Sequence, residues 1–275
     1  SQISVVIATI GGSVLDRTVS ILNNSSVFPD EIIVVIPKEY EYNIPAKSFP
    51  NLRYEIVPFK GQVAQRAYGF KIAKYKFVLQ LDDDIYLDYK CIENLIRGLN
   101  YLGPGHSVGP SIFFKEDGMT IYPSGKGIAK LFSGFFSNHN LMGTINKFGS
   151  AYGYDYDITN NNINPTEWLA GGCVLHYKNG LILNDFFPFT GKAYGEDLIH
   201  SVNLSNNGIL LFNIKSAVCY IDKPVIDSMS YSLRDDFRSR CYLNKKRGVS
   251  IVYVYFWFFT KTIINFHVYG WKCFF

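Results

Sequence analysis

The sequence of 275 residues lacks several features that mark common classes of protein. Its five cysteines are scattered and form no Cys-x-x-Cys pair, which favours reduced thiols in a cytosolic protein over a disulfide framework or a zinc site. The 27 Lys and Arg residues nearly balance the 23 Asp and Glu residues, so we expect no nucleic-acid partner. We also expect no signal peptide, because no basic region precedes the first apolar run, Ile3–Ala8.

Long apolar runs and a complete dinucleotide-binding motif are also missing. The run Val249–Phe259 is almost wholly apolar, but its 11 residues fall short of the about 20 that a membrane-spanning helix needs. Gly11 and Gly12 follow the first apolar run without the rest of a Gly-x-Gly-x-x-Gly pattern, and we interpret them as a turn.

Short apolar strands alternate with helices in the first hundred residues. The predicted strands are Ile3–Ala8, Glu31–Ile36, Leu52–Val57 and Tyr75–Leu81. The predicted helices are Ser13–Asn23, Gln62–Lys74 and Asp88–Leu102. This alternation predicts an α/β fold with a mostly parallel sheet flanked by helices, in which ligands bind beyond the carboxyl ends of the strands.

The second part of the chain has a different pattern. Residues 115–165 are rich in Gly, Ser, Asn and Tyr with weak periodicity, which indicates a functional loop or lid, or structure that the pattern does not reveal. Strand character returns at Trp168–Leu175, and Gly195–Leu204 is predicted to be a helix with Glu196 and Asp197 in its first turn.

Three consecutive carboxylates, Asp82, Asp83 and Asp84, follow the strand Tyr75–Leu81. Because side chains alternate along an extended chain, Asp82 and Asp84 can face one side and Asp83 the other. Clustered carboxylates repel one another unless a cation neutralises them, and oxygen ligands suit Mg²⁺ or Mn²⁺. The alternative is a solvated acidic turn before the next helix.

Four pieces in a fixed order resemble a known family. They are a first strand ending in Ala8-Thr9, the stretch Gly61–Phe70, the triplet Asp82–Asp84, and Trp168 with Gly171-Gly172 followed by Gly195-Glu196-Asp197. Together they resemble family 2 glycosyltransferases, with the Rossmann-like GT-A fold, over roughly residues 3–225. The resemblance implies a cytosolic, inverting enzyme that transfers one sugar from a nucleotide-sugar to an acceptor hydroxyl with Mg²⁺ or Mn²⁺, and the expected donor is a UDP-sugar.

The resemblance also assigns residues in the donor half. Asp84 would bind the metal, and Asp82 would bind the ribose, or the metal through water. Arg66 would face the nucleotide, and Thr9 would lie beside the base. The remaining residues assigned to the nucleotide-sugar are Gln62 and Asp83.

In the acceptor half, the resemblance assigns Asp197 as the general base, with Glu196 beside it. A carboxylate can accept the proton that the attacking hydroxyl loses. Gly171 and Gly172 would let an acceptor or diphosphate approach the backbone closely, and Trp168 would offer an apolar face to a sugar ring. Structural alternatives exist for these assignments. Arg66 could form an ion pair on the surface, and Trp168 could lie in the core. Glu196 and Asp197 could be ordinary acids of a first helical turn, where the helix dipole favours negative charge.

Some family features are absent from the sequence. The second strand ends in Val35–Lys38 without the acidic pair that often reads the base, so the base is open. The Gln-x-x-Arg-Trp motif of processive synthases is missing, which favours single-sugar addition. A histidine that sometimes completes the metal site has no clear counterpart, and Cys219–Asp222 lies about there.

We expect two halves of one domain, residues 1–110 for the nucleotide-sugar and 111–225 for the acceptor, followed by a tail, 226–275. Basic residues Lys245–Arg247 before Val249–Phe259 fit a segment lying on an anionic membrane. The alternative is a buried C-terminal helix or strand.

The expected acceptor is a polyprenyl-diphosphate-linked saccharide at the inner face of the plasma membrane, as in bacterial O-antigen (lipopolysaccharide) or capsule synthesis. The alternatives are a non-catalytic, membrane-associated sugar-binding protein of this fold and a nucleotidyltransferase. The latter usually carries a Gly-rich basic loop after the first strand, where only Arg17 is near.

Overall fold

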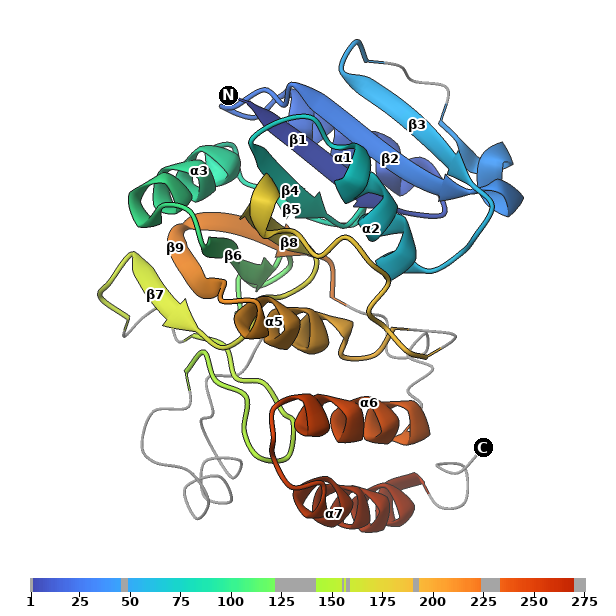
Figure 1. Cartoon of the computed structure of the whole chain (residues 1–275), viewed down its shortest axis with the longest axis vertical. Helices are drawn as coiled ribbons and strands as arrows, with labels where there is room; N and C mark the ends of the chain where they lie inside the picture. The colour runs from blue at the N-terminus through green and yellow to red at the C-terminus, as the bar shows by residue number, and fades with distance from the viewer. Residues whose placement is uncertain are drawn as a thin grey trace.

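The computed structural model describes residues 2–45, 49–121, 142–154, 156, 159–189, 193–223 and 233–269. Within these ranges, nine strands form one sheet in the order β3-β2-β1-β4-β8-β6-β9-β5, with β7 paired to β9. Figure 1 shows the sheet in the upper part of the molecule and the two C-terminal helices stacked below α5 (Glu196–Asn206). The molecule is therefore an α/β structure built on one large sheet.

The first half of the sheet is parallel, as the alternation of strands and helices predicts. Its strands are β1 (Ile3–Ala8), β2 (Glu31–Pro37), β3 (Leu52–Val57) and β4 (Phe77–Leu81). The helices between and after them are α1 (Ser13–Asn23), α2 (Gln62–Ile72) and α3 (Cys91–Leu102), with a short 3₁₀ helix η1 (Lys38–Asn43). The predicted bounds agree with these to within about three residues, as helix and strand ends usually do.

The second half of the sheet is mixed, which the prediction of a mostly parallel sheet does not capture. Its strands are β5 (Tyr86–Leu87), β6 (His106–Phe114), β7 (Ile163–Thr166), β8 (Cys173–Tyr177) and β9 (Leu210–Ile221), with η2 at Lys178–Gly180. β8 lies between β4 and β6 and is antiparallel to both. The strand begins only at Cys173, so the predicted strand residues Trp168–Gly172 form the turn that leads into it.

Close packing of α2 against the sheet positions the residues of this helix. A Cβ added at Gly69 would lie 2.4 Å from Cγ1 of Val6 on β1, so only glycine permits this approach. On the same face, Nε2 of Gln65 donates to the carbonyls of Thr9 at 3.0 Å and Val35 at 2.8 Å. The carboxyl ends of β1 and β2 are thereby held against α2.

The C-terminal segment begins with a helix that belongs to the domain. Two side chains of α6 (Leu233–Lys246) and that of the next residue hold the loop at residues 145–150. Arg240 donates to the Phe148 carbonyl at 3.0 Å, Asn244 to the Lys147 carbonyl at 2.7 Å, and Arg247 to the Ile145 carbonyl at 2.6 Å. Residues 226–232 and 270–275 of the predicted tail lie outside the described residues.

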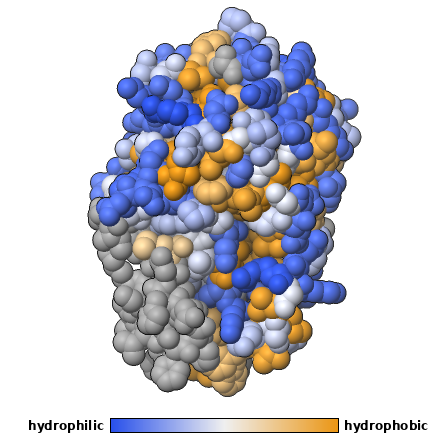
Figure 2. Space-filling view, turned by 60° about the vertical axis from the view of Figure 1, so that its left-hand side comes forward, coloured by the Kyte–Doolittle hydropathy of each residue, from blue (hydrophilic) through white to orange (hydrophobic). Residues whose placement is uncertain are grey.

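The last helix, α7 (Val252–Tyr269), packs on α6 and leaves apolar side chains exposed. Figure 2 shows hydrophobic side chains gathered at the lower end of the molecule, where α7 lies in Figure 1. Among the residues described, none of the helices has the length and apolar character needed to cross a membrane.

Candidate active site

The acidic triplet lies at the carboxyl end of β4, as predicted. The backbone N–H of Asp82 donates to the carbonyl of Gly172 at 2.8 Å, which ties the triplet to the turn before β8. The hydroxyl of Thr9 donates to Oδ2 of Asp83, and the hydroxyl of Thr18 on α1 donates to the Asp83 carbonyl. Asp83 therefore faces the end of β1, away from the partners of Asp82.

Arg66 on α2 is 3% exposed, and its guanidinium joins two carboxylates from distant parts of the chain. Nη2 donates to Oδ1 of Asp82 at 2.5 Å, and Nη1 donates to Oε1 of Glu196 at 2.5 Å. Gln62, one turn earlier, donates to the same Asp82 oxygen at 3.1 Å. Burial lowers the pKa of Arg66, but the charges of Glu196 and Asp82 outweigh burial and raise it.

These bonds change the interpretation of Arg66. Both terminal nitrogens are bonded to protein carboxylates, so Arg66 positions the acids, and its predicted contact with the nucleotide stays a prediction. An arginine fork suits this because it can bond two carboxylates at once, which a lysine cannot do with the same geometry.

Glu196 and Asp197, at the start of α5, are adjacent but have different environments. Glu196 is 7% exposed and is bonded to Arg66. Burial raises the pKa of Asp197 to about 7, with the charge of Glu196 adding to the effect. Oδ1 of Asp197 accepts only its neighbour's backbone N–H, that of Leu198, at 2.9 Å among the hydrogen bonds of the described residues. Asp197 can therefore exchange a proton near neutral pH.

The turn at Gly171 and Gly172 separates the triplet from this acidic pair. A Cβ at Gly171 would lie 2.6 Å from Oε1 of Glu196 and 3.3 Å from Cβ of Asp197. A Cβ at Gly172 would lie 3.1 Å from Ile85 and 3.4 Å from Oδ2 of Asp82. The glycines thus allow both sets of carboxylates to approach one turn of backbone, while the predicted close approach of an acceptor or diphosphate stays a prediction.

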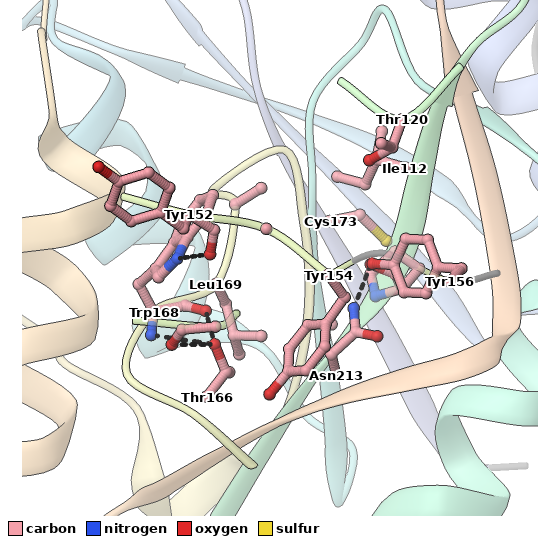
Figure 3. A pocket seen from close by; sticks show the side chains of 15 residues that line it. Ile112, Thr120, Tyr152, Tyr154, Tyr156, Thr166, Trp168, Leu169, Cys173 and Asn213 are labelled. Carbon is pink, nitrogen blue, oxygen red and sulfur yellow. Dashed lines mark hydrogen bonds between the residues drawn. The ribbon is translucent and has the colours of Figure 1, made fainter. Parts of the chain in front are cut away.

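Trp168 lies in the core, contrary to the prediction of a sugar-facing ring. It is 5% exposed and packs with Ile199, Val202 and Leu243. Its indole N–H donates to the Tyr152 carbonyl at 3.0 Å, as Figure 3 shows. The cavity drawn there has about 40 Å³ of free space, which suits a few waters and is too small for a sugar ring.

The acid cluster has the chemistry of a site for a hard cation. The side chain of Asp84 is exposed, but its carboxyl is partly desolvated, and this together with the charges of Asp82 and Asp83 raises its pKa. A cation would relieve this repulsion, and carboxylate oxygens suit Mg²⁺ or Mn²⁺. Across the described ranges, no group of three His, Cys, Asp or Glu side chains is close enough to hold a metal. The residues fit a cation that takes further ligands from water and substrate phosphates.

Three residues near the triplet are not among the predicted site residues. The guanidinium carbon of Arg17 lies 3.8 Å from the centre of the Tyr86 ring, and the Tyr86 hydroxyl donates to Asp222 at 2.7 Å. Antiparallel pairing of Tyr86 with Tyr220 places the end of β9 beside the triplet. In the sequence, the stretch Cys219–Asp222 lies about where some family members carry a metal-site histidine. The strand pairing that brings Asp222 beside the triplet depends on the register of the sheet, which the sequence does not show.

Comparisons with known proteins show the family and the fold of the chain. The model of glycosyl transferase family 2 matches residues 4–154, more than half of the chain. No curated protein sequence matches significantly.

Two solved structures have a similar fold. GalNAc-T7, solved with UDP, GalNAc and Mn²⁺, has a TM-score of 0.62 and 14% identity, covering 89% of this chain and 48% of that one. S. aureus TarS 1–349, solved with UDP-GlcNAc, has a TM-score of 0.55 and 16% identity, covering 90% and 66%. The chain thus spans about half to two thirds of the length of these structures. The fold is GT-A, and the chain belongs to glycosyl transferase family 2.

Proposed function

We propose that the protein is a metal-dependent, inverting glycosyltransferase that moves one sugar from a UDP-sugar to an acceptor hydroxyl. The observation that carries the proposal is the meeting of two kinds of carboxylate at Gly171-Gly172. On one side lies the triplet with the exposed Asp84, and on the other lies Asp197, with a pKa of about 7.

The proposed reaction is a single displacement. The acceptor oxygen bonds to the anomeric carbon, the bond from that carbon to the diphosphate oxygen breaks, and its electron pair leaves with UDP. Asp197 accepts the hydroxyl proton as the new bond forms. Asp84, with Asp82, would hold Mg²⁺ or Mn²⁺, which supplies charge neutralisation for the departing diphosphate. Arg66 and Gln62 orient Asp82, and Glu196 orients Arg66.

The choice of UDP is supported by the two similar structures, which were solved with UDP and with UDP-GlcNAc. It is a proposal for this chain because the identities are 14% and 16%. The end of β2 provides no acidic pair to read the base. The test therefore uses donors that differ in the base and in the sugar.

The test is release of nucleoside diphosphate from a panel of UDP- and GDP-sugars, with Mn²⁺, Mg²⁺ or a chelator. We expect metal-dependent slow hydrolysis of at least one UDP-sugar even without acceptor, and loss of metal-dependent donor binding in Asp84→Asn with the fold intact. Normal turnover in Asp84→Asn contradicts the metal assignment. A folded protein that binds a nucleotide-sugar and never releases UDP supports the non-catalytic alternative instead.

We propose further that the acceptor is a polyprenyl-diphosphate-linked saccharide of O-antigen or capsule synthesis, and that the protein lies on the inner face of the plasma membrane. Helix α7 supports this, because five apolar side chains on it are more than half exposed: Val252, Tyr255, Phe256, Phe259 and Ile263. Spacings of three and four residues place them along one side of the helix.

Nearby charges are suited to an anionic surface. Lys245 and Lys246 at the end of α6 and Lys261 on α7 are exposed, and each can contribute about 1 kcal/mol near anionic lipid. Arg247, the third residue of the predicted basic cluster, is used inside the protein, where it donates to the carbonyls of Asn146 and Ile145.

Vesicle co-sedimentation tests this second proposal. Truncating the tail would remove α6, which holds the loop at residues 145–150, so we choose point variants. Phe256→Glu with Phe259→Glu should abolish binding to phosphatidylglycerol-containing vesicles and leave UDP-sugar hydrolysis unchanged, whereas the exposed control Tyr101→Glu should bind normally. Equal binding by all three proteins contradicts the proposal, as does a dimer in solution that the double substitution dissociates.

A further inference from the structure

A groove beside the candidate active site has the size of a ligand site and no role in the mechanism above. It lies between the start of α2 and the segment before α5, and its volume is about 610 Å³. Small-molecule sites commonly have volumes of about 300–1,000 Å³. The lining residues that matter for the argument are Lys60, Gln62, Ala64, Asp185, Phe187 and Phe189.

The groove adjoins the reacting groups at two points. Gln62, on one wall, donates to Oδ1 of Asp82 at 3.1 Å. Ala193, on the other wall, accepts at its carbonyl the N–H of Glu196 at 3.3 Å, so this wall continues into the turn that carries Asp197. A molecule in the groove would have one end beside Asp82 and the other beside the start of α5.

Aromatic side chains form a supported wall. Phe187 and Phe189 meet edge to face with centroids 5.4 Å apart, and Phe189 meets Tyr242 of α6 at 5.8 Å. The guanidinium of Arg238 lies 4.7 Å from the Phe189 ring centre. The wall thus rests on α6, the helix against which α7 packs.

The polar groups of the groove argue against a phosphate and for a sugar. Among the described residues that line the groove, the cation is Lys60, which already bonds Tyr40 at 2.5 Å and lies 3.2 Å from Glu39, and Asp185 adds a negative charge. From these described residues a diphosphate would therefore meet little free positive charge. A pyranose ring presents an apolar face that packs on aromatic rings and hydroxyls that bond amide and carboxylate oxygens, which Gln62 and Asp185 supply.

We propose that this groove binds the terminal sugar of the acceptor and directs its hydroxyl toward Asp197. The inference rests on the proposed function and adds the location and chemical class of the acceptor subsite. The lipid end of the acceptor would leave the groove past Phe189, on the side of α6 and α7.

The experiment separates the donor reaction from acceptor binding. The probes are methyl and octyl hexopyranosides, tested in the presence of UDP and Mn²⁺ by saturation-transfer NMR, and as acceptors by UDP release above the rate of hydrolysis. The variants are Phe187→Ala, which removes one ring, and Ala64→Phe, which fills the groove from α2 without removing a contact. The matched control is Tyr101→Ala, an exposed ring on α3 that is 82% exposed.

We expect wild type to bind at least one hexoside, and Phe187→Ala to raise the KM for it by about 3- to 10-fold, the range for one lost aromatic contact. Ala64→Phe should abolish the transfer signal, and both variants should hydrolyse the UDP-sugar at the wild-type rate. Unchanged hexoside binding in both variants overturns the inference, as does no hexoside signal with wild type. Loss of UDP binding in folded variants would assign the groove to the nucleotide and also overturn it. Failure of the proposed function differs from all of these, because wild type would then release no UDP.

Discussion

Replacing Asp197 by asparagine should have opposite effects on turnover and on stability. The pKa of Asp197 is raised from an ordinary value of 3.8 to about 7, first by burial and then by the charge of Glu196. A shift of about 3 units corresponds to a cost of about 4 kcal/mol for the ionised form. Because the side chain is partly exposed, we expect about 1–2 kcal/mol of this to be recovered when an uncharged amide takes its place.

The sign follows from proton binding. Between pH 3.8 and about 7, the unfolded chain has lost the Asp197 proton while the folded protein keeps it, so the free energy of unfolding falls as pH rises through this window. In Asp197→Asn this contribution is absent. In urea unfolding at pH 5 and pH 8, the variant should therefore be the more stable protein at pH 8, and the difference between the two free energies of unfolding should be clearly smaller at pH 5.

The same change should lower turnover by about 10²–10⁴-fold, because the attacking hydroxyl loses its general base. In wild type, kcat/KM should rise about tenfold per pH unit up to a pKa near 7 and then level off. Donor affinity, measured by titration with UDP, should stay within about twofold because Asp197 makes no bond to the triplet. Turnover above a tenth of wild type, or a variant less stable at pH 8, would refute this assignment and make Asp197 a structural acid.

Three further outcomes are expected. Gly171→Ala should lower turnover strongly, because its Cβ would lie 2.6 Å from Oε1 of Glu196, and should lower the melting temperature as well. Arg66→Lys keeps the charge but loses the guanidinium that bonds two carboxylates at once. The free energy of unfolding, measured with urea, should therefore fall by about 1–3 kcal/mol, and turnover should fall as well. Burial lowers the pKa of His200 to about 3 and that of His176 well below its ordinary 6.5. The melting temperature should therefore fall as pH drops below about 6.5, because the unfolded chain then binds protons that the folded protein does not. His200→Phe should make this fall with pH less steep.

The first half of the fold could be predicted because its signals are local. Strands β1 and β3 and helix α1 have the predicted bounds, since apolar runs and their polar boundaries lie within each segment. The second half depends on pairing between distant segments. Strand β9 pairs with β5, β6 and β7, and the direction of β8 follows from neighbours 70 to 100 residues away, for which a local pattern carries no information.

The candidate site divides in the same way. The place of Asp82–Asp84 at a strand end is a local property and was predictable. The partner of Arg66 was not, because Glu196 is separated from it by 130 residues. The burial of Trp168 was equally hidden, since an aromatic residue beside a glycine pair fits a sugar platform and a core anchor alike.

The stretch Gly61–Phe70 shows how one helix can serve both the fold and the site. Gln62 and Arg66 are four residues apart, so they lie on one face, and both bond Asp82. Gln65 and Gly69 are also four residues apart and lie on the face toward the sheet. Gln65 donates to the backbone at the ends of β1 and β2, and Gly69 packs against the side chains of these strands. The position of Asp82 is therefore set by the same rigid element that packs on the strand ends. A substitution that shifts α2 on the sheet, even one far from the carboxylates, should disturb the acid cluster and through Arg66 the start of α5.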